Sequence, residues 1–127
     1  MNDILVTLKP GDDYCFFQMP KEGFFNSNVV SLLRGFQMKR AAKGIRVRGL
    51  AMHENRSIVW KIFRGLKHSE IRYLDEFTPN SIIVYANKIL MLDWNNLNQI
   101  SAFVIESRTF SDTYRKFFDQ KWRAASN

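Results

Sequence analysis

The sequence predicts an α/β protein with a single mixed β-sheet flanked by helices. Apolar runs at 81–85, 89–92 and 100–105 predict neighbouring strands, and the polar break at 86–88 favours a β-hairpin between the first two. A helical stretch that ends at Gly44 leads directly into a strand-like stretch, as in the helix-to-strand half of an α/β unit. An aromatic stripe near the C-terminus predicts a helix that packs on this sheet.

Length and composition favour one domain over residues 1–127, with 46% apolar residues and a formal net charge of +7. No apolar run approaches the ~20 residues that a membrane span requires. The N-terminus lacks the basic and apolar regions of a secretory signal, so we expect a cytoplasmic protein that does not bind a membrane. Cys15 is the single cysteine, which excludes an internal disulfide and a cysteine-based zinc cluster.

The N-terminal part reads as two short strands. The β-branched run at 4–8 predicts the first strand, and Pro10 and Gly11 favour a turn at 9–13. The aromatic run at 14–19 predicts the second strand, which ends at the break over 20–23.

The middle of the chain predicts a repeated helix–strand pattern. A helix begins near Ser27 or Asn28 and ends at Gly44, and the alternating run at 45–52 predicts a strand. The next helix can be capped by Asn55 or Ser57, and 71–74 resumes a strand. The expected apolar stripe of the first helix consists of Val29, Val30, Leu32, Leu33, Phe36 and Met38.

The last helix has the clearest periodicity. Its first turn can be capped by Thr109 or Ser111. Five aromatic residues fall on one helical face, which predicts that this face packs on the sheet. They are Phe110, Tyr114, Phe117, Phe118 and Trp122.

The positive charge is concentrated in residues 34–72, which hold eleven basic and two acidic residues. Arg46 and Arg48 are two positions apart and are therefore expected on one strand face. Such a block can attract nucleic acid or another anion, although bases on solvated helix faces are also common. The other members of the predicted anion or nucleic-acid patch lie on the preceding helix: Arg34, Lys39, Arg40 and Lys43.

No motif for catalysis, metal binding or cofactor binding is present in the sequence. His53 and His68 have no metal-ligand spacing and are interpreted as surface or structural residues. The glycines form no phosphate-binding loop, and no nucleophile elbow occurs. We therefore expect no catalytic residue, no metal ion and no cofactor.

Five segments in order resemble the phospholipase D-like domain found at the C-terminus of TrmB-like, archaeal-type transcriptional regulators. They include Glu-x-Arg-Tyr-Leu at 70–74 and Phe-x-x-x-Trp at 118–122. The resemblance implies a phospholipase D-like fold over roughly 29–125. The segments are 40–50, 70–74, 81–92, 102–107 and 114–124.

The resemblance also implies that the chain is not an enzyme. Catalytic members carry His-x-Lys followed five residues later by Asp, where the histidine attacks a phosphodiester. This chain has Asn80, Ile82 and Asn87 in the matching frame, and neither an amide nor an isoleucine can perform those roles. TrmB-like regulators place a winged-helix DNA-binding domain before this one, and residues 1–28 are too short to form it.

The resulting expectation is a non-catalytic regulatory domain for effector sensing and dimerisation, with a homodimer interface at the former active-site edge. DNA would be bound through a separate domain or directly through the basic patch. The alternatives are a nucleic-acid-binding module that uses residues 34–72, and a degenerate phosphodiesterase or nuclease. A small-molecule effector is expected near the C-terminal edge of the sheet, around Asn80, Asn87, Arg72 and Trp94.

Overall fold

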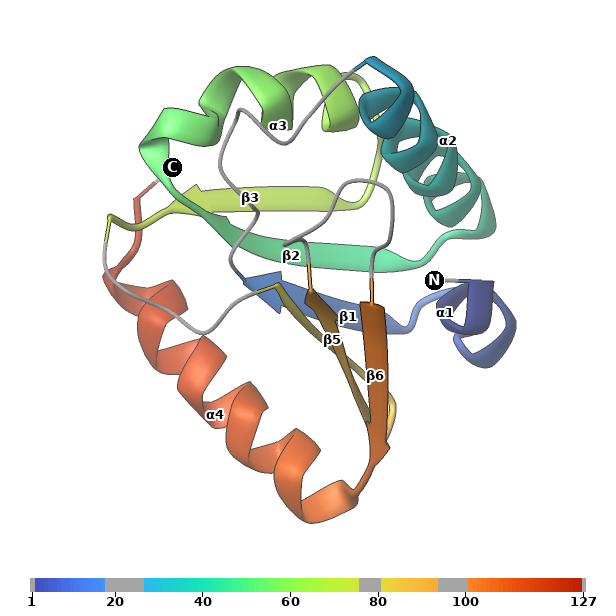
Figure 1. The fold of residues 1–127 in the computed structure, drawn as a ribbon, viewed down its shortest axis with the longest axis vertical. Helices are drawn as coiled ribbons and strands as arrows, with labels where there is room; N and C mark the ends of the chain where they lie inside the picture. The colour runs from blue at the N-terminus through green and yellow to red at the C-terminus, as the bar shows by residue number, and fades with distance from the viewer. Residues whose placement is uncertain (1, 18–26, 76–80, 94–100, 127) are drawn as a thin grey trace.

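The computed structural model describes residues 2–17, 27–75, 81–93 and 101–126. These residues form one sheet with helices on both of its faces (Figure 1). The elements in chain order are α1 (Asn2–Thr7), β1 (Asp13–Phe17), α2 (Ser27–Lys43), β2 (Arg46–Ala51), the 3₁₀ helix η2 (His53–Asn55), α3 (Arg56–Phe63), β3 (Ser69–Tyr73), β4 (Ile82–Tyr85), β5 (Lys88–Asp93), β6 (Ser101–Glu106) and α4 (Arg108–Ala124).

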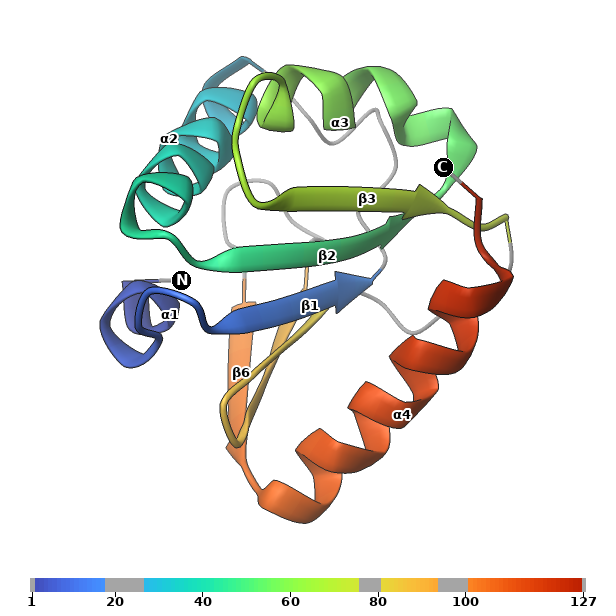
Figure 2. The same ribbon diagram turned by 180° about the vertical axis from the view of Figure 1, so that it is seen from behind.

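The sheet has the strand order β3-β2-β1-β4-β5-β6. Strands β1, β2 and β3 are parallel, whereas β4, β5 and β6 follow β1 as antiparallel neighbours. The sheet is strongly twisted, so that β5 and β6 run steeply across the direction of β1 to β3 (Figures 1 and 2). The predicted fold class, a mixed sheet flanked by helices, is therefore confirmed.

Two apolar clusters hold the helices against the two faces of the sheet. The α2 and α3 side contains Tyr14, Val47 and Ile62 in one cluster of buried residues. The α4 side contains Phe17 and Phe118 in the other cluster. Figure 2 shows α2 and α3 together on one side and α4 alone on the opposite side. This layering buries most side chains of β1, β2 and β4, whereas those of β6 are largely exposed.

The prediction of a strand at 4–8 is wrong, because α1 covers Asn2–Thr7. Ile4 and Leu8 are both buried, and the Leu8 N–H donates to the Ile4 carbonyl at 3.0 Å. Val6 lies between them and is 80% exposed. Burial four residues apart is the helical period, so tertiary packing overrides the β-branched composition.

Gly44 ends α2 as predicted, with φ of +82°. The Gly44 N–H donates to the Ala41 carbonyl at 3.0 Å, and the next N–H, of Ile45, reaches the Arg40 carbonyl at 3.2 Å. These two bonds satisfy carbonyls that the helix end would otherwise leave free. The expected apolar stripe is only partly correct, because Leu32 and Met38 are exposed.

The predicted caps differ from the observed ones. Ser107 caps α4, accepting from the Phe110 N–H at 3.2 Å, so the prediction of Thr109 or Ser111 is wrong. Phe110 is exposed and lies outside the buried aromatic face of α4. Asn55 precedes α3 as predicted, but its side chain makes no capping hydrogen bond.

Candidate nucleic-acid interface

Three loops meet where the parallel strands begin, and together with the residues that flank the second loop, at the end of α2 and the start of β2, we call them the amino edge: residues 9–12, 43–46 and 64–68. The Gly11 N–H donates to the Gly44 carbonyl at 2.9 Å, which joins the first loop to the second. The Arg46 N–H donates to the Asp12 carbonyl at 2.9 Å. The Val47 N–H donates to the His68 carbonyl at 2.9 Å, which connects the third loop. Backbone hydrogen bonds therefore hold the three loops as one surface.

The amino edge is strongly basic, because it holds five basic residues against one acidic residue. It thus carries four of the seven net positive charges of the chain. All six side chains are exposed. The six residues are Lys9, Lys43, Arg46, Arg64, Lys67 and Asp12.

Most of this charge is uncompensated. Among the described residues, no carboxylate forms an ion pair with Lys9, Arg46 or Lys67. The neighbouring Asp13 instead lies 4.0 Å from Arg48. Exposed cations on adjoining loops create a positive potential that favours anions with several charges.

Arg40 is buried beneath the amino edge and holds its loops together. It is 0% exposed, so its predicted place in the surface patch is wrong. One guanidinium nitrogen donates to the carbonyls of Ile45 at 2.9 Å, Lys67 at 3.1 Å and His68 at 3.1 Å. The other terminal nitrogen donates to Ser69 Oγ at 2.6 Å. Arg40 therefore ties the second loop to the third.

A buried polar network completes the Arg40 site. The Arg40 Nε donates to Gln37 Oε1 at 2.7 Å, and the Gln37 amide donates to the Tyr14 hydroxyl at 3.2 Å. Burial lowers the pKa of the Arg40 guanidinium, and it raises the pKa of Tyr14 to about 12. Arginine stays protonated in proteins, so the positive charge persists beneath the loops.

The sequence contained a signal for the burial of Arg40. It follows Phe36 by four residues and Val29 by eleven, so all three lie on one helical face. Phe36 is buried, and Arg40 occupies the last turn of that face, opposite loop carbonyls that need donors.

His68 adopts a left-handed backbone conformation, with φ of +62°. A residue with a Cβ adopts this region at a cost of about 1–3 kcal/mol. The conformation presents the His68 carbonyl to both Arg40 and the Val47 N–H. The interpretation of His68 as a surface residue is consistent with its exposed side chain. Its backbone contributes to the loop geometry.

Arg34 is also used within the fold. Its guanidinium donates to the carbonyls of Lys61 at 3.5 Å, Ile62 at 3.0 Å and Arg64 at 3.1 Å. A cation that binds the free carbonyls at a helix C-terminus stabilises that helix, here α3. By contrast, Lys39 is exposed on α2, one turn before Lys43.

Lys43 and Arg46 are exposed at the amino edge as the sequence predicted. Lys43 Nζ donates to the Leu5 carbonyl and so fixes the end of α1, while its side chain stays at the surface. The predicted patch therefore separates into an exposed group and an internal group. The exposed group is Lys39, Lys43 and Arg46, and the internal group is Arg34, Arg40 and Arg48.

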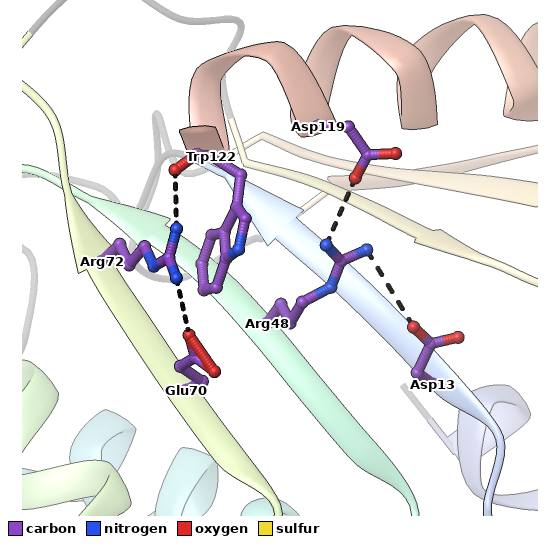
Figure 3. Close-up of polar contacts among 6 residues, drawn as sticks. All are labelled: Asp13, Arg48, Glu70, Arg72, Asp119 and Trp122. Carbon is purple, nitrogen blue, oxygen red and sulfur yellow. Dashed lines mark hydrogen bonds and ion pairs between the residues drawn. The ribbon is translucent and has the colours of Figure 1, made fainter. Parts of the chain in front are cut away.

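Arg48 does not share a free surface with Arg46. Its guanidinium donates to the Asp119 carboxylate at 3.2 Å (Figure 3). Its central carbon also lies 5.1 Å from the centroid of the Phe118 ring and 5.6 Å from that of Trp122. Arg48 therefore docks α4 on the sheet through ion-pair and cation–π contacts.

Arg72, which was predicted to bind a ligand, performs the same role from β3. It lies 4.3 Å from the Trp122 ring centroid and donates to the Trp122 carbonyl at 3.0 Å (Figure 3). Glu70 pairs with it at 3.3 Å. The indole is thus bracketed by Arg72 on one side and Arg48 on the other.

The other residues of the predicted effector site are not brought together with Arg72. Arg72 lies near the carboxyl end of β3, whereas Asn87 lies in the β4–β5 turn, beside the amino end of β1. These two positions are at opposite ends of the sheet. Asn80 and Trp94 lie outside the described residues.

A histidine–carboxylate pair at the carboxyl end of β2 was missed by the sequence analysis. His53 Nδ1 lies 2.6 Å from Asp75 Oδ2, and the His53 N–H donates to Asp75 Oδ1 at 2.9 Å. The backbone hydrogen bond from His53 is the main cause that lowers the pKa of Asp75. The two residues are 22 positions apart, so no local motif reveals them. Among the described residues, no group of three or more potential metal ligands occurs.

The fold and the basic loops define a small α/β domain with one strongly basic edge. No protein-family model and no curated protein matches the chain. A search of solved structures finds TrmBL2, an archaeal chromatin protein whose structure "shows a novel mode of DNA binding". The similarity has a TM-score of 0.62 at 11% identity, and it covers 98% of this chain and 48% of that chain.

This similarity shows a shared fold over about half the length of TrmBL2. It agrees in fold with the resemblance to TrmB-like regulators, while the phospholipase D-like assignment stays a prediction. Within the described part of the chain, no helix is long and apolar enough to span a membrane.

Proposed function

We propose that the chain is a non-catalytic domain of a DNA-associated regulator, and that its amino edge contacts the DNA phosphate backbone. The observation that carries this proposal is the concentration of four of the seven net charges on three interlocked loops. Cations that neutralise phosphates release condensed counterions, and this release supplies most of the affinity of sequence-independent binding.

The geometry of the amino edge favours phosphate contact. Arg46 and Lys67 project from loops whose backbones are fixed by buried Arg40, so less ordering is needed when an anion binds. The basic residues of the edge lie in short loops, at the last residue of α2 and at the first residue of β2, and do not form a row along one helix face. We therefore expect backbone contacts with little sequence preference.

The shared fold supports this assignment. TrmBL2 is described as a chromatin protein with a mode of DNA binding, and the present chain has the fold of about half of that protein. Effector sensing and a homodimer interface at the former active-site edge, which the sequence resemblance implies, stay predictions.

Absence of catalysis is part of the proposal. Ile82 occupies the place of the phosphate-binding lysine in the matching frame, and its side chain is buried. It belongs to the same apolar cluster as Val84 and Phe118, so it serves as a core residue. We expect no turnover of a chromogenic phosphodiester; turnover that is lost in His53→Ala or His68→Ala variants would support the phosphodiesterase alternative.

Two charge-reversal variants test the DNA contact. The double variant Arg46→Glu/Lys67→Glu changes two exposed cations of the amino edge. The matched control, Lys116→Glu/Arg123→Glu, makes the same change in net charge at exposed positions of α4. Binding to a fluorescent 25-base-pair duplex is measured by anisotropy at fixed salt.

We expect the amino-edge variant to lose about tenfold or more in affinity, because two phosphate contacts become repulsive. The control should lose much less, because net charge alone acts at long range and is screened by salt. Equal losses in the two variants would contradict a localised interface, and unchanged binding in both would contradict phosphate contact.

A further inference from the structure

Strand β6 ends the sheet, and among the described residues no element pairs with its outer side (Figure 1). Its large side chains are exposed on both faces, with Phe103 at 60% and Val104 at 56% exposure. An uncovered apolar edge strand is a ready template for another strand. The strand contains no lysine, no proline and no arginine, the residues that commonly protect such an edge.

The ladder with β5 fixes which backbone groups of β6 face outward. The Ser107 N–H donates to the Asn87 carbonyl at 2.9 Å, so this position faces β5. In an antiparallel pair the backbone N–H and carbonyl groups of successive residues point alternately toward the paired strand and away from it. Positions 101, 103 and 105 therefore also face β5, whereas the N–H and carbonyl groups of Ala102, Val104 and Glu106 point away from the sheet.

We propose that a second copy of this chain pairs with β6 in an antiparallel register centred on Val104. Two opposing residues in such a pair have backbone groups of the same orientation, either both outward or both toward their own sheet. A self-paired β6 is therefore centred on a residue and not between two residues. Centring on Val104 joins all three outward positions: Val104 faces its own counterpart, and Ala102 faces Glu106 of the second copy. A register centred on Phe103 would place Glu106 beyond the end of the partner strand.

The side chains of this register are complementary. Phe103 faces Ile105 of the second copy on the α4 side of the sheet, an aromatic and β-branched pair that stabilises sheets. Val104 faces Val104 on the other side, where it continues the cluster of Leu90. Glu106 faces an alanine, so no like charges are opposed.

The exposure of both faces favours a strand as the partner. Phe103 lies on the face of Met91 and Val104 on the face of Leu90, so a helix docked on one face would leave the other uncovered. An added strand covers part of both faces and also satisfies the free backbone groups.

The pairing is independent of DNA binding, and the two respond oppositely to salt. Salt screens the repulsion between two chains of charge +7, whereas it weakens a phosphate contact.

Two substitutions at one position test the register. We expect sedimentation equilibrium to give twice the chain mass for the wild type. Val104→Lys and Val104→Glu should each raise the dimer dissociation constant at least tenfold, because like charges then face each other. An equimolar mixture of the two variants should recover the dimer, because the introduced lysine faces the introduced glutamate. Val6→Lys and Val6→Glu, at an exposed valine of α1, are the matched controls and should remain dimeric.

A wild type that stays monomeric at millimolar concentration, or a mixture that fails to recover the dimer, would overturn the proposal. A cross-linking experiment covers the case in which a charged variant fails to fold. Directly opposed residues in this ladder have Cα atoms about 5.5 Å apart, within disulfide range. Val104→Cys should therefore form a disulfide-linked dimer on oxidation. The wild type should not, because Cys15 is buried and burial raises its pKa to about 12. No cross-link in Val104→Cys would count against the pairing.

Discussion

Replacing Arg40 with methionine tests whether its buried guanidinium holds the loops of the amino edge together. The substitution keeps an apolar stem in a site that is 0% exposed but removes five hydrogen bonds. A buried acceptor left without a donor costs about 1–3 kcal/mol. Because Lys67 and His68 are exposed, their loop can open and recover water for some carbonyls. We therefore expect a loss of about 3–5 kcal/mol, less than the simple sum.

Urea unfolding followed by tryptophan fluorescence measures this loss. Lys39→Met is the control, because it also replaces a basic side chain with methionine, one residue earlier and at an exposed position, and surface substitutions stay within about 0.5 kcal/mol. Hydrogen exchange adds a local readout: the Val47 amide, which donates to the His68 carbonyl, should exchange faster in Arg40→Met. A loss below about 1 kcal/mol would refute the role assigned to Arg40.

Two further predictions concern the core and the N-terminal helix. A Cβ at Gly49 would collide with the Phe16 ring and lie 2.8 Å from Ile71 Cδ1, so Gly49→Ala should lose about 1–3 kcal/mol in urea unfolding, and an unchanged midpoint would contradict this packing. The hydrogen bond from Lys88, at 2.9 Å, is the main cause that lowers the pKa of Asp3 below its ordinary value of 3.8. The stability that Asp3 contributes is therefore complete above pH 3.8 and is lost as the pH falls through the lowered pKa. The free energy of unfolding of Asp3→Asn should therefore fall less on acidification than that of the wild type. Identical dependences of this free energy on pH in the two proteins would refute the contribution of Asp3.

The sequence was sufficient to predict the sheet and three of the helices because the periodicities are local. The apolar runs at 81–85 and 89–92 correspond to β4 and β5, and Gly44 marks the end of α2. Helix α1 was predicted wrongly because Ile4, Val6 and Leu8 alternate as in a strand. Only the fold reveals that Ile4 and Leu8 are buried while Val6 is not.

The candidate site was only partly predictable, because net charge along a chain does not distinguish cations that hold the fold together from cations that face solvent. Lys43 and Arg46 are exposed as expected. Arg34 binds a backbone carbonyl 27 residues away, Arg40 binds carbonyls both 5 and 27 residues away, and Arg48 contacts Asp119 71 residues away. Such partners are set by packing and leave no local pattern in the sequence.

The salt dependence of DNA binding tests the account most directly. The logarithm of the association constant should fall linearly with the logarithm of salt concentration, with a slope that counts the neutralised phosphates. Arg46→Glu/Lys67→Glu should reduce the magnitude of this slope by about two, because two phosphate contacts are lost. Lys116→Glu/Arg123→Glu should leave the slope at the wild-type value. A slope that is unchanged in the amino-edge variant, or reduced equally in both variants, would contradict the amino edge as the DNA-contacting surface.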